Sequence, residues 1–213
     1  MKKHQLISVM GTMGSGKTTA ARVIAKALGY QLVEENFGEN AFLPRFYNDM
    51  KRWAFHSQTF FIMEKINQML EAPKLLAKGG VVQDTPIQQD AFSYAKAQHV
   101  LGNIDDAEWK LYQKIYKSFE PYFPKPKLIV YLETSIPIVV SRIESRGREY
   151  EQQIPQSYLE LLDMLNHKWL TENAAAKGKK IPVLTVHTDE LNIAKSPVAQ
   201  QTLIDLVSKK LRW

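Results

Sequence analysis

Residues 11–18, GTMGSGKT, have the types and spacing of a phosphate-binding loop, G-x-x-x-x-G-K-[ST]. Glycines at these places let the backbone curl until its N–H groups point at phosphate oxygens, and a following helix adds its N-terminal dipole. Lys17 would reach the β- and γ-phosphates, and the Thr18 hydroxyl would be a ligand of Mg²⁺. We therefore predict that ATP or a similar triphosphate, with Mg²⁺, binds to Gly11, Thr12, Met13, Gly14, Ser15, Gly16, Lys17, Thr18 and Thr19.

Three arginines stand within seven residues further along the chain, namely Arg142, Arg146 and Arg148. The first two are one helical turn apart, and Gly147 can end the helix so that Arg148 turns toward the same space. Guanidinium groups bind phosphate oxygens through paired hydrogen bonds, and the anionic transition state of phosphoryl transfer needs such charges in place beforehand. We predict that these arginines are catalytic and clamp the transferring phosphoryl group. The alternative is a solvated basic face in which Glu144 and Glu149 pair with them.

The composition excludes several other kinds of site. The chain of 213 residues contains no cysteine, which excludes disulfides, thiolate metal sites and a cysteine nucleophile. No apolar run approaches the ~20 residues of a membrane span, so we expect no membrane contact and a cytoplasmic protein. The net charge of +6 suits a polyphosphate as well as a nucleic acid. We expect no nucleic-acid partner, because basic and aromatic residues form no strip beyond the arginine cluster.

Strands and helices that alternate along the chain must position these residues. Short apolar runs bounded by turn residues predict strands at 5–11, 30–35, 79–85, 127–134 and 181–187. Helical periodicity predicts helices at 17–28, 50–71, 88–100, 106–119, 136–146, 156–174 and 197–211. No break in composition divides residues 1–213. We therefore predict one α/β domain of P-loop NTPase type, with a five-stranded parallel sheet flanked by helices and an arginine-rich lid at about 142–152.

Several segments, besides the phosphate-binding loop, resemble the deoxynucleoside kinase family, P-loop enzymes that phosphorylate the 5′-hydroxyl of deoxynucleosides. EENFGENAFLPRFY (34–47) is similar to the family's Glu-Pro-Val-x-x-Asn-Pro segment and the aromatic pair that follows it. KRWAFHSQTFF (51–61) resembles its helix with a base-reading glutamine, and QDTPIQQD (83–90) stands at its Asp/Glu-Arg-Ser segment. SRIESRGREYE (141–151) matches its lid, Arg-x-x-x-Arg-Gly-Arg-x-x-Glu. The resemblance covers nearly the whole chain and implies Mg²⁺-dependent phosphoryl transfer from ATP to a deoxynucleoside.

The resemblance implies roles for individual residues around the acceptor. Glu35, with Glu34 as the neighbouring alternative, falls on the family's general base, just past the second strand, where open α/β sheets bind ligands. Gln58 would pair with the base, unless it bonds to backbone in an ordinary core helix. Asp84 would serve Mg²⁺ through water, together with Thr18. The other substrate-binding residues implied by the resemblance are Tyr47, Lys65, Asp90, Tyr94 and Glu151.

Two positions depart from the family's pattern. Where the family has the arginine of its Asp/Glu-Arg-Ser segment, this chain has Thr85, so that Glu35 and the phosphates would lack a cation. Where the family has an arginine that pairs with the aspartate matching Asp90, this chain has Lys65, which keeps the charge but not the planar fork. The first departure predicts a slower enzyme or an unusual acceptor.

Three functions remain open from the sequence. The leading hypothesis is a kinase that phosphorylates a deoxynucleoside, with purines slightly favoured because similar short bacterial chains are often purine kinases. The second is a thymidylate-type nucleotide kinase, which Glu35 disfavours because a phosphate acceptor needs no general base. The third is a nucleotide-binding regulatory protein without turnover, which Thr85 supports. The family is commonly dimeric, so the resemblance also implies a homodimer.

Overall fold

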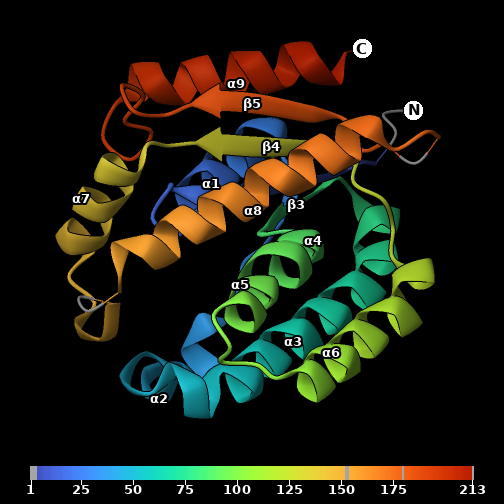
Figure 1. The fold of residues 1–213 in the computed structure, drawn as a ribbon. Helices are drawn as coiled ribbons and strands as arrows, with labels where there is room; N and C mark the ends of the chain where they lie inside the picture. Colours follow the sequence, from blue (N-terminus) through green and yellow to red (C-terminus); the bar gives the residue numbers. More distant parts are fainter. Residues whose placement is uncertain (1–3, 152–153, 179, 213) are drawn as a thin grey trace.

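A parallel five-stranded sheet forms the centre of the computed structural model, which describes residues 4–151, 154–178 and 180–212 (Figure 1). The strands are β1 (Leu6–Gly11), β2 (Gln31–Val33), β3 (Val81–Asp84), β4 (Leu128–Glu133) and β5 (Val183–His187). Their order is β2-β3-β1-β4-β5, and all neighbouring pairs are parallel. This confirms the predicted sheet. Because β1 is the central strand, the loop that follows it opens over the middle of the sheet edge.

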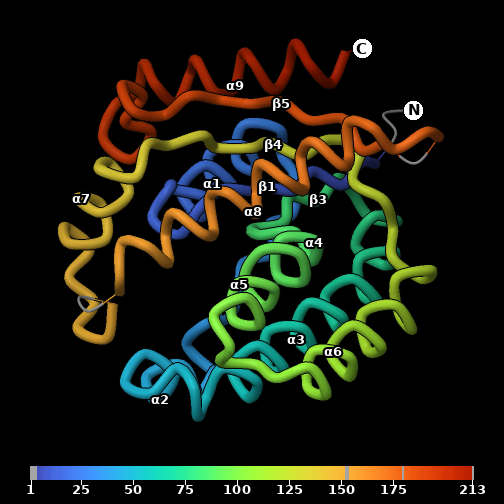
Figure 2. The backbone as a smooth tube through the Cα atoms, viewed as in Figure 1, coloured from blue at the N-terminus to red at the C-terminus, as the bar shows by residue number. Residues whose placement is uncertain are grey.

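Helices cover both faces of the sheet (Figure 1). The α-helices are α1 (Lys17–Leu28), α2 (Leu43–Asn48), α3 (Met50–Lys78), α4 (Ile87–Gln89), α5 (Ala95–Val100), α6 (Asp106–Phe119), α7 (Ile136–Arg146), α8 (Gln156–Ala175) and α9 (Pro197–Leu211). Shorter turns are the 3₁₀-helices η1 (Phe37–Glu39), η3 (Glu120–Tyr122) and η4 (Glu149–Glu151) and the π-helix η2 (Asp90–Tyr94). α1 and α9 pack on one face, while α3, α6 and α8 pack on the other. In Figure 2, α3 and α6 run side by side below the sheet.

The central strand is buried along its length because both of its faces are covered, and its one polar side chain, Ser8, donates a hydrogen bond to Gln83 of β3. Successive side chains of a strand point to opposite faces of the sheet. Ile7 and Val9 accordingly pack with α1 and α9, while Leu6 packs with α3 and α6, and Met10 packs with α8. Each such fully buried side chain contributes about 1.5–3 kcal/mol. The core therefore holds the sheet edge and its phosphate-binding loop in a fixed place.

The bounds of some helices differ from the sequence prediction. The helix predicted at 50–71 continues to Lys78 and contains Pro73, whose missing N–H leaves the carbonyl of Met69 without its helical hydrogen bond. The single helix predicted at 88–100 divides into α4, η2 and α5. The sequence analysis does not predict η1 and α2, although Pro44 in the first turn of α2 is typical of a helix start. Both missed helices lie between β2 and α3, next to the candidate site.

Candidate active site

The carboxyl ends of the strands open into a cavity of about 960 Å³. Its walls come from the loop after β1, the segment after β2, α3, η2, α7 and the loop after β5. The predicted site residues that line it are Met13, Gly14, Ser15, Gly16, Lys17, Thr18, Thr19, Glu35, Tyr47, Gln58, Asp84, Asp90, Tyr94, Arg142, Arg146, Arg148 and Glu151. The remaining three, Gly11, Thr12 and Lys65, lie outside this lining. The structure thus brings the predicted donor side and the predicted acceptor side into one space.

Glycine shapes the loop between β1 and α1. Gly14 has a φ of 80° and Gly16 a φ of 97°, both in the left-handed region that glycine tolerates best. Gly14 also lies against α7, where a Cβ atom would come within 2.9 Å of the Ile143 side chain and 3.0 Å of the Val139 carbonyl oxygen. The Ser15 hydroxyl in this loop is buried and has no hydrogen-bond partner among the described residues. A curled loop with a buried hydroxyl left to donate suits an anionic ligand.

Lys17 lies across its own loop and reaches toward the acceptor side. Its Nζ donates to the carbonyl oxygen of Gly11 over 3.0 Å and to the hydroxyl of Tyr94 over 3.3 Å. Burial lowers the pKa of Lys17, and the carboxylates of Asp84 and Glu35 oppose that shift. The ammonium group is therefore held where the two predicted substrates would meet.

Thr18 and Asp84 fit the Mg²⁺ assignment. The Thr18 hydroxyl, at the start of α1, donates to Oδ2 of Asp84, at the end of β3, over 2.6 Å. The pair presents two hard oxygen ligands beside the phosphate-binding loop and leaves most of an octahedral shell for phosphates and water, as Mg²⁺ usually requires. In the described part of the chain, no group of three or more His, Asp or Glu side chains could hold a metal ion by itself.

The two glutamates after β2 have different partners. Glu35 lies with Oε1 3.6 Å from the Nζ of Lys65, and its side chain is 23% exposed. Glu34 also borders the cavity, but it accepts two hydrogen bonds from the exposed guanidinium of Arg22, and these lower the pKa of Glu34. The geometry favours Glu35 as the proton acceptor, because Glu34 is already engaged in an ion pair with solvent access.

Lys65 does not make the contact that the resemblance implies. It is 1% exposed, donates to the carbonyl oxygen of Asp84 over 2.7 Å, and has Glu35 as its ion-pair partner. The Oδ2 atom of Asp90 is buried and has no hydrogen-bond partner among the described residues. Burial raises the pKa of Asp90 well above its usual range, and Lys65 offsets part of this shift. The flexible lysine thus reaches the predicted base, while the aspartate remains on the cavity wall.

Amide and aromatic side chains line the acceptor side. Gln58 is 4% exposed, and none of the hydrogen bonds within the described residues uses its amide. Tyr47 stacks on Tyr150 with the ring centroids 5.5 Å apart, and Phe61 and Tyr94 line the same space. An amide with no partner beside aromatic rings can pair with a base edge while the rings contact the face of the base. This arrangement disfavours the alternative of an ordinary core glutamine bonded to backbone.

Arg142 differs from the other two arginines of the cluster. Its guanidinium donates to the carbonyl oxygens of Ser15 over 3.0 Å and of Thr188 over 2.6 Å. These bonds tie α7 to the phosphate-binding loop and to the loop after β5. Arg142 lines the cavity, yet much of its donor capacity is used by the protein itself. Within the described ranges, neither Glu144 nor Glu149 pairs with an arginine of the cluster, which disfavours the solvated-face alternative.

Arg146 and Arg148 share one partner, the buried carboxylate of Glu151. Nη1 of Arg148 lies 3.1 Å from this carboxylate, and the Arg146 guanidinium donates to its other oxygen. Gly147 ends α7 with a φ of 68°, as the sequence predicts for a helix stop. The predicted lid extends to about Gln152, which lies outside the described residues. Two cations on one carboxylate leave an excess of positive charge facing the cavity.

Comparison with known proteins decides the family. A model of the family described as deoxynucleoside kinase matches residues 7–212. This chain belongs to the deoxynucleoside kinase family. It is accordingly a phosphotransferase that phosphorylates deoxynucleosides to their monophosphates with ATP. This acceptor agrees with the leading hypothesis from the sequence, and it differs from the nucleotide acceptor of the second hypothesis and from the absence of turnover in the third.

Several named kinases are similar to this deoxynucleoside kinase along most of their length. It is 31% identical over 208 residues to the deoxyadenosine/deoxycytidine kinase of Bacillus subtilis (strain 168), a match that covers 97% of this chain and 93% of the relative. The deoxyguanosine kinase of the same organism is 29% identical, with 89% of each chain covered. Among solved structures, a deoxyadenosine kinase from M. mycoides with bound dATP has a TM-score of 0.81 and 26% identity, covering 97% of this chain and 99% of that one.

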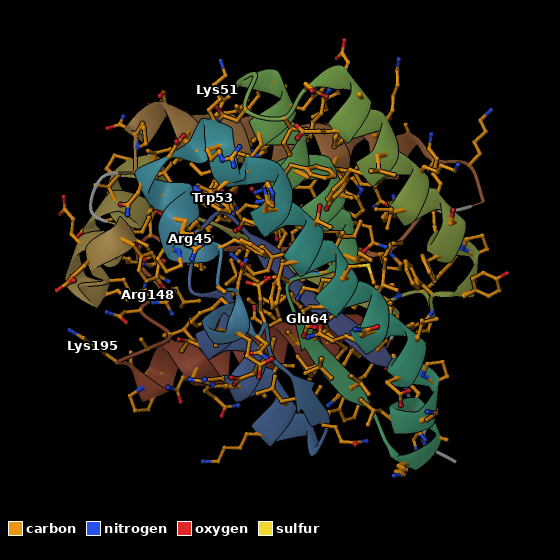
Figure 3. The ribbon with its side chains drawn as sticks, turned by 90° about the horizontal axis from the view of Figure 1, so that it is seen from below. Arg45, Lys51, Trp53, Glu64, Arg148 and Lys195 are labelled. Atoms are coloured by element: carbon orange, nitrogen blue, oxygen red, sulfur yellow. The ribbon has the colours of Figure 1, made fainter. Side chains whose placement is uncertain are left out.

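The loop after β5 is a part of the cavity lining that the sequence analysis missed. Asp189, Asn192 and Lys195 of this loop line the cavity, and Asp189 accepts a hydrogen bond from the Ser135 backbone N–H over 2.8 Å. Figure 3 shows Lys195 on the same side of the molecule as Arg148, which also lines the cavity. The loop follows a strand of a parallel sheet at its carboxyl end, where such sheets bind ligands. The position of this loop, directly after a predicted strand, could therefore have indicated its place in the cavity.

Proposed function

We propose that this deoxynucleoside kinase uses Glu35 as the general base when the γ-phosphoryl group of ATP moves to the 5′-hydroxyl of a deoxynucleoside. The hydroxyl oxygen bonds to the γ-phosphorus, the bond from that phosphorus to the β–γ bridging oxygen breaks, and Glu35 takes the hydroxyl proton. The products are a deoxynucleoside 5′-monophosphate and ADP. The observation that carries the proposal is the place of Glu35 in the cavity beside Lys65, while Glu34 is held by the exposed Arg22.

The donor side of the proposed site is the loop at residues 11–19. Its backbone N–H groups would bind the phosphates, and Lys17 would move from its carbonyl partners to the β- and γ-phosphates. Thr18 and Asp84 would hold Mg²⁺, which neutralises phosphate charge when it is bound. Lys17 also contacts the hydroxyl of Tyr94 on the acceptor side, so its ammonium group lies between the two proposed substrates.

Arg146 and Arg148 form the proposed lid over the transferring group. A phosphoryl group carries more negative charge than one carboxylate and accepts paired hydrogen bonds from guanidinium groups. Both arginines would therefore leave Glu151 at least in part when ATP binds. The carboxylate released in this way, together with the Tyr47 hydroxyl, would bind the sugar 3′-hydroxyl. Arg142 would stay in place and fix the lid helix against the phosphate-binding loop.

A purine deoxynucleoside is the acceptor that we propose. The Gln58 amide offers both a donor and an acceptor to the edge of a base. Burial raises the pKa of Asp90, so that its carboxyl group can remain protonated and donate to a ring nitrogen. The two Bacillus subtilis relatives are named for deoxyadenosine and deoxycytidine in one case and for deoxyguanosine in the other, and a purine deoxynucleoside is the acceptor class that both names contain.

A cytoplasmic homodimer is the proposed assembly. Met63 and Leu70 on α3 and Leu111 on α6 are large apolar side chains between 41% and 50% exposed, on two helices that run side by side (Figure 2). An apolar face on two adjoining helices suits a symmetric interface between copies of one chain. No helix of the described residues is both long and apolar enough to cross a bilayer. We also propose that the protein does not bind nucleic acid.

Glu35→Gln tests the proposed base, and Glu34→Gln is its matched control. We expect Glu35→Gln to lower kcat by about 10²-fold or more, with the KM for ATP nearly unchanged. Glu34→Gln should change kcat by less than about 3-fold, because it removes only an exposed ion pair. Both are measured with labelled ATP and a panel of deoxynucleosides and nucleoside monophosphates. A larger effect of Glu34→Gln would reverse the assignment, and normal activity of both would mean that the acceptor needs no general base.

A further inference from the structure

We propose that Lys65 is a positioning residue that holds Glu35 for proton transfer, in place of the arginine that the family's pattern has at the position of Thr85. This inference rests on the proposed role of Glu35. Lys65 reaches the site from the middle of α3, with its Nζ 2.7 Å from the Asp84 carbonyl oxygen and 3.6 Å from Oε1 of Glu35. Because Lys65 is 1% exposed and does not line the cavity, it would act on the acceptor through Glu35.

Glu35 needs such an anchor because it follows β2 in a segment without regular structure. Among the described residues, Lys65 is the one cation within ion-pair distance of its carboxylate. A buried ammonium group is costly to leave without a partner, so the lysine and the glutamate constrain each other. The carbonyl oxygen of Asp84 fixes the lysine from the sheet side. The proton acceptor is thereby linked to the same strand end that carries the proposed Mg²⁺ ligand.

Position 85 itself cannot supply this charge. Thr85 is fully buried, lies outside the cavity lining and has a φ of 60°, which a β-branched side chain rarely adopts. Its N–H donates to the carbonyl oxygen of Val9, and its hydroxyl lies 3.4 Å from Oδ1 of Asp84. The side chain therefore stays within the protein interior. The long, flexible stem of a lysine on α3 can supply the missing charge from the opposite direction.

The alternative is that Lys65 supports base recognition through Asp90, as the family's arginine does. The structure disfavours it, because Oδ2 of Asp90 is buried and has no hydrogen-bond partner among the described residues. The Lys65 ammonium donates instead to the backbone carbonyl oxygen of Asp84. The two roles predict different kinetics. A positioning residue for Glu35 governs kcat, whereas a residue that supports base recognition governs the KM of the nucleoside and the preference among bases.

Lys65→Met tests the proposal, with Lys74→Met as a matched control on an exposed turn of the same helix. We expect Lys65→Met to lower kcat by about 10-fold to 100-fold, with nucleoside KM values changed by less than about 3-fold and the order of preference among bases retained. Lys65→Arg, which keeps the charge, should recover at least part of the lost kcat. Lys74→Met should behave as wild type. A raised nucleoside KM with unchanged kcat, or an altered base preference, would overturn the proposal.

The same substitution in the Glu35→Gln background separates this proposal from the proposed function. If Lys65 acts through Glu35, Lys65→Met should change the kcat of the Glu35→Gln enzyme by less than about 2-fold. Independent, multiplicative effects would overturn the positioning role while leaving Glu35 as the base. If Glu35→Gln alone retains full activity, the proposed base fails instead. Should Lys65→Met not fold, Lys65→Gln keeps a donor for the Asp84 carbonyl without the charge and is expected to show the same loss of kcat.

Discussion

The donor side and the acceptor side of the cavity are built in different ways. The donor side is one continuous loop, in which Lys17 bonds to carbonyl oxygens of its own segment and Gly14 and Gly16 set the backbone path. The acceptor side consists of single side chains from separate elements, with Glu35 after β2 and Gln58 on α3. The donor side is therefore defined by local backbone geometry, and the acceptor side by the distances between elements.

This difference indicates which positions of the site can accept other residues within one family. A loop that binds phosphates through its backbone cannot tolerate other residues at its glycines, because a Cβ at Gly14 would press on α7. On the acceptor side, our proposal for Lys65 implies that a charge can come from another residue, provided that it reaches the same place. In this chain the cation beside Glu35 comes from Lys65 on α3, and position 85 holds a buried threonine.

Lys17→Met should have the largest effect on kcat and should impair only the donor side of the site. We expect kcat to fall by about 10³-fold or more, because the charge on the β- and γ-phosphates is lost. The melting temperature should stay close to that of the wild type, since methionine fills the space of the lysine stem. Steady-state assays and circular dichroism melting measure the two quantities. A folded variant with normal turnover would contradict the phosphate-binding role of the loop.

Arg146→Ala and Arg142→Ala should separate the lid from its support. Arg146→Ala should lower kcat by about 10²-fold to 10³-fold, in line with the loss of one preorganised charge. Arg142→Ala should lower the free energy of unfolding by about 1–3 kcal/mol, because its bonds to the Ser15 and Thr188 carbonyl oxygens are lost. Denaturant unfolding and kcat are measured on both variants. If Arg142→Ala has the larger kinetic effect, the assignment of support and lid is reversed.

Asp90→Asn should affect the acceptor side of the site and leave the donor side unchanged. We expect the KM of the preferred nucleoside to rise by up to about 10-fold, because the amide N–H is a weaker hydrogen-bond donor than the proposed carboxyl O–H, while the KM of ATP stays unchanged. The ratio of the two KM values is the measurement. Equal changes in both would mean that Asp90 supports the whole cavity and does not read the base.

Asp90→Asn should also change how stability depends on pH. Burial raises the pKa of Asp90, so the folded protein keeps a proton that the unfolded chain releases above its ordinary value of 3.8. The contribution of Asp90 to stability is therefore present at acidic pH and is lost as the pH rises toward the folded-state pKa. The melting temperature of Asp90→Asn relative to the wild type should rise from mildly acidic to mildly alkaline pH. A constant difference would show that Asp90 does not titrate in this way.

Thr85→Gly should have the smallest effect. Glycine adopts a φ of 60° without the strain of a β-branched side chain, but it also loses the buried methyl and hydroxyl groups, so these effects should nearly cancel and the free energy of unfolding should change by less than about 1 kcal/mol. The kcat should change by less than about 2-fold, because the proposed cation is on α3. Thr85→Val keeps the branch but loses the hydroxyl, and it should be less stable than the wild type. Denaturant unfolding ranks the three proteins. A loss of well over about 1 kcal/mol in Thr85→Gly would contradict the proposal that threonine is strained at this φ.

The sequence alone determined the glycine-rich loop at residues 11–18, the five parallel strands and the end of α7 at Gly147. Each depends on residues that are neighbours in the chain: glycines that accept left-handed φ values, apolar runs, and a helix stop. The family resemblance also supplied Glu35, Gln58 and the arginine cluster, which the structure brings to one cavity.

Only the tertiary structure decided which partner each of these side chains has. Glu34 and Glu35 are adjacent in sequence, yet Arg22 of α1 holds the first while Lys65 of α3 holds the second. Arg142 is bound by the distant Thr188, and the loop that contains Thr188 enters the site only because β5 lies beside β4. The physical reason is range: backbone geometry is set within a few residues, whereas an ion pair or hydrogen bond is set by the packing of elements far apart in the chain.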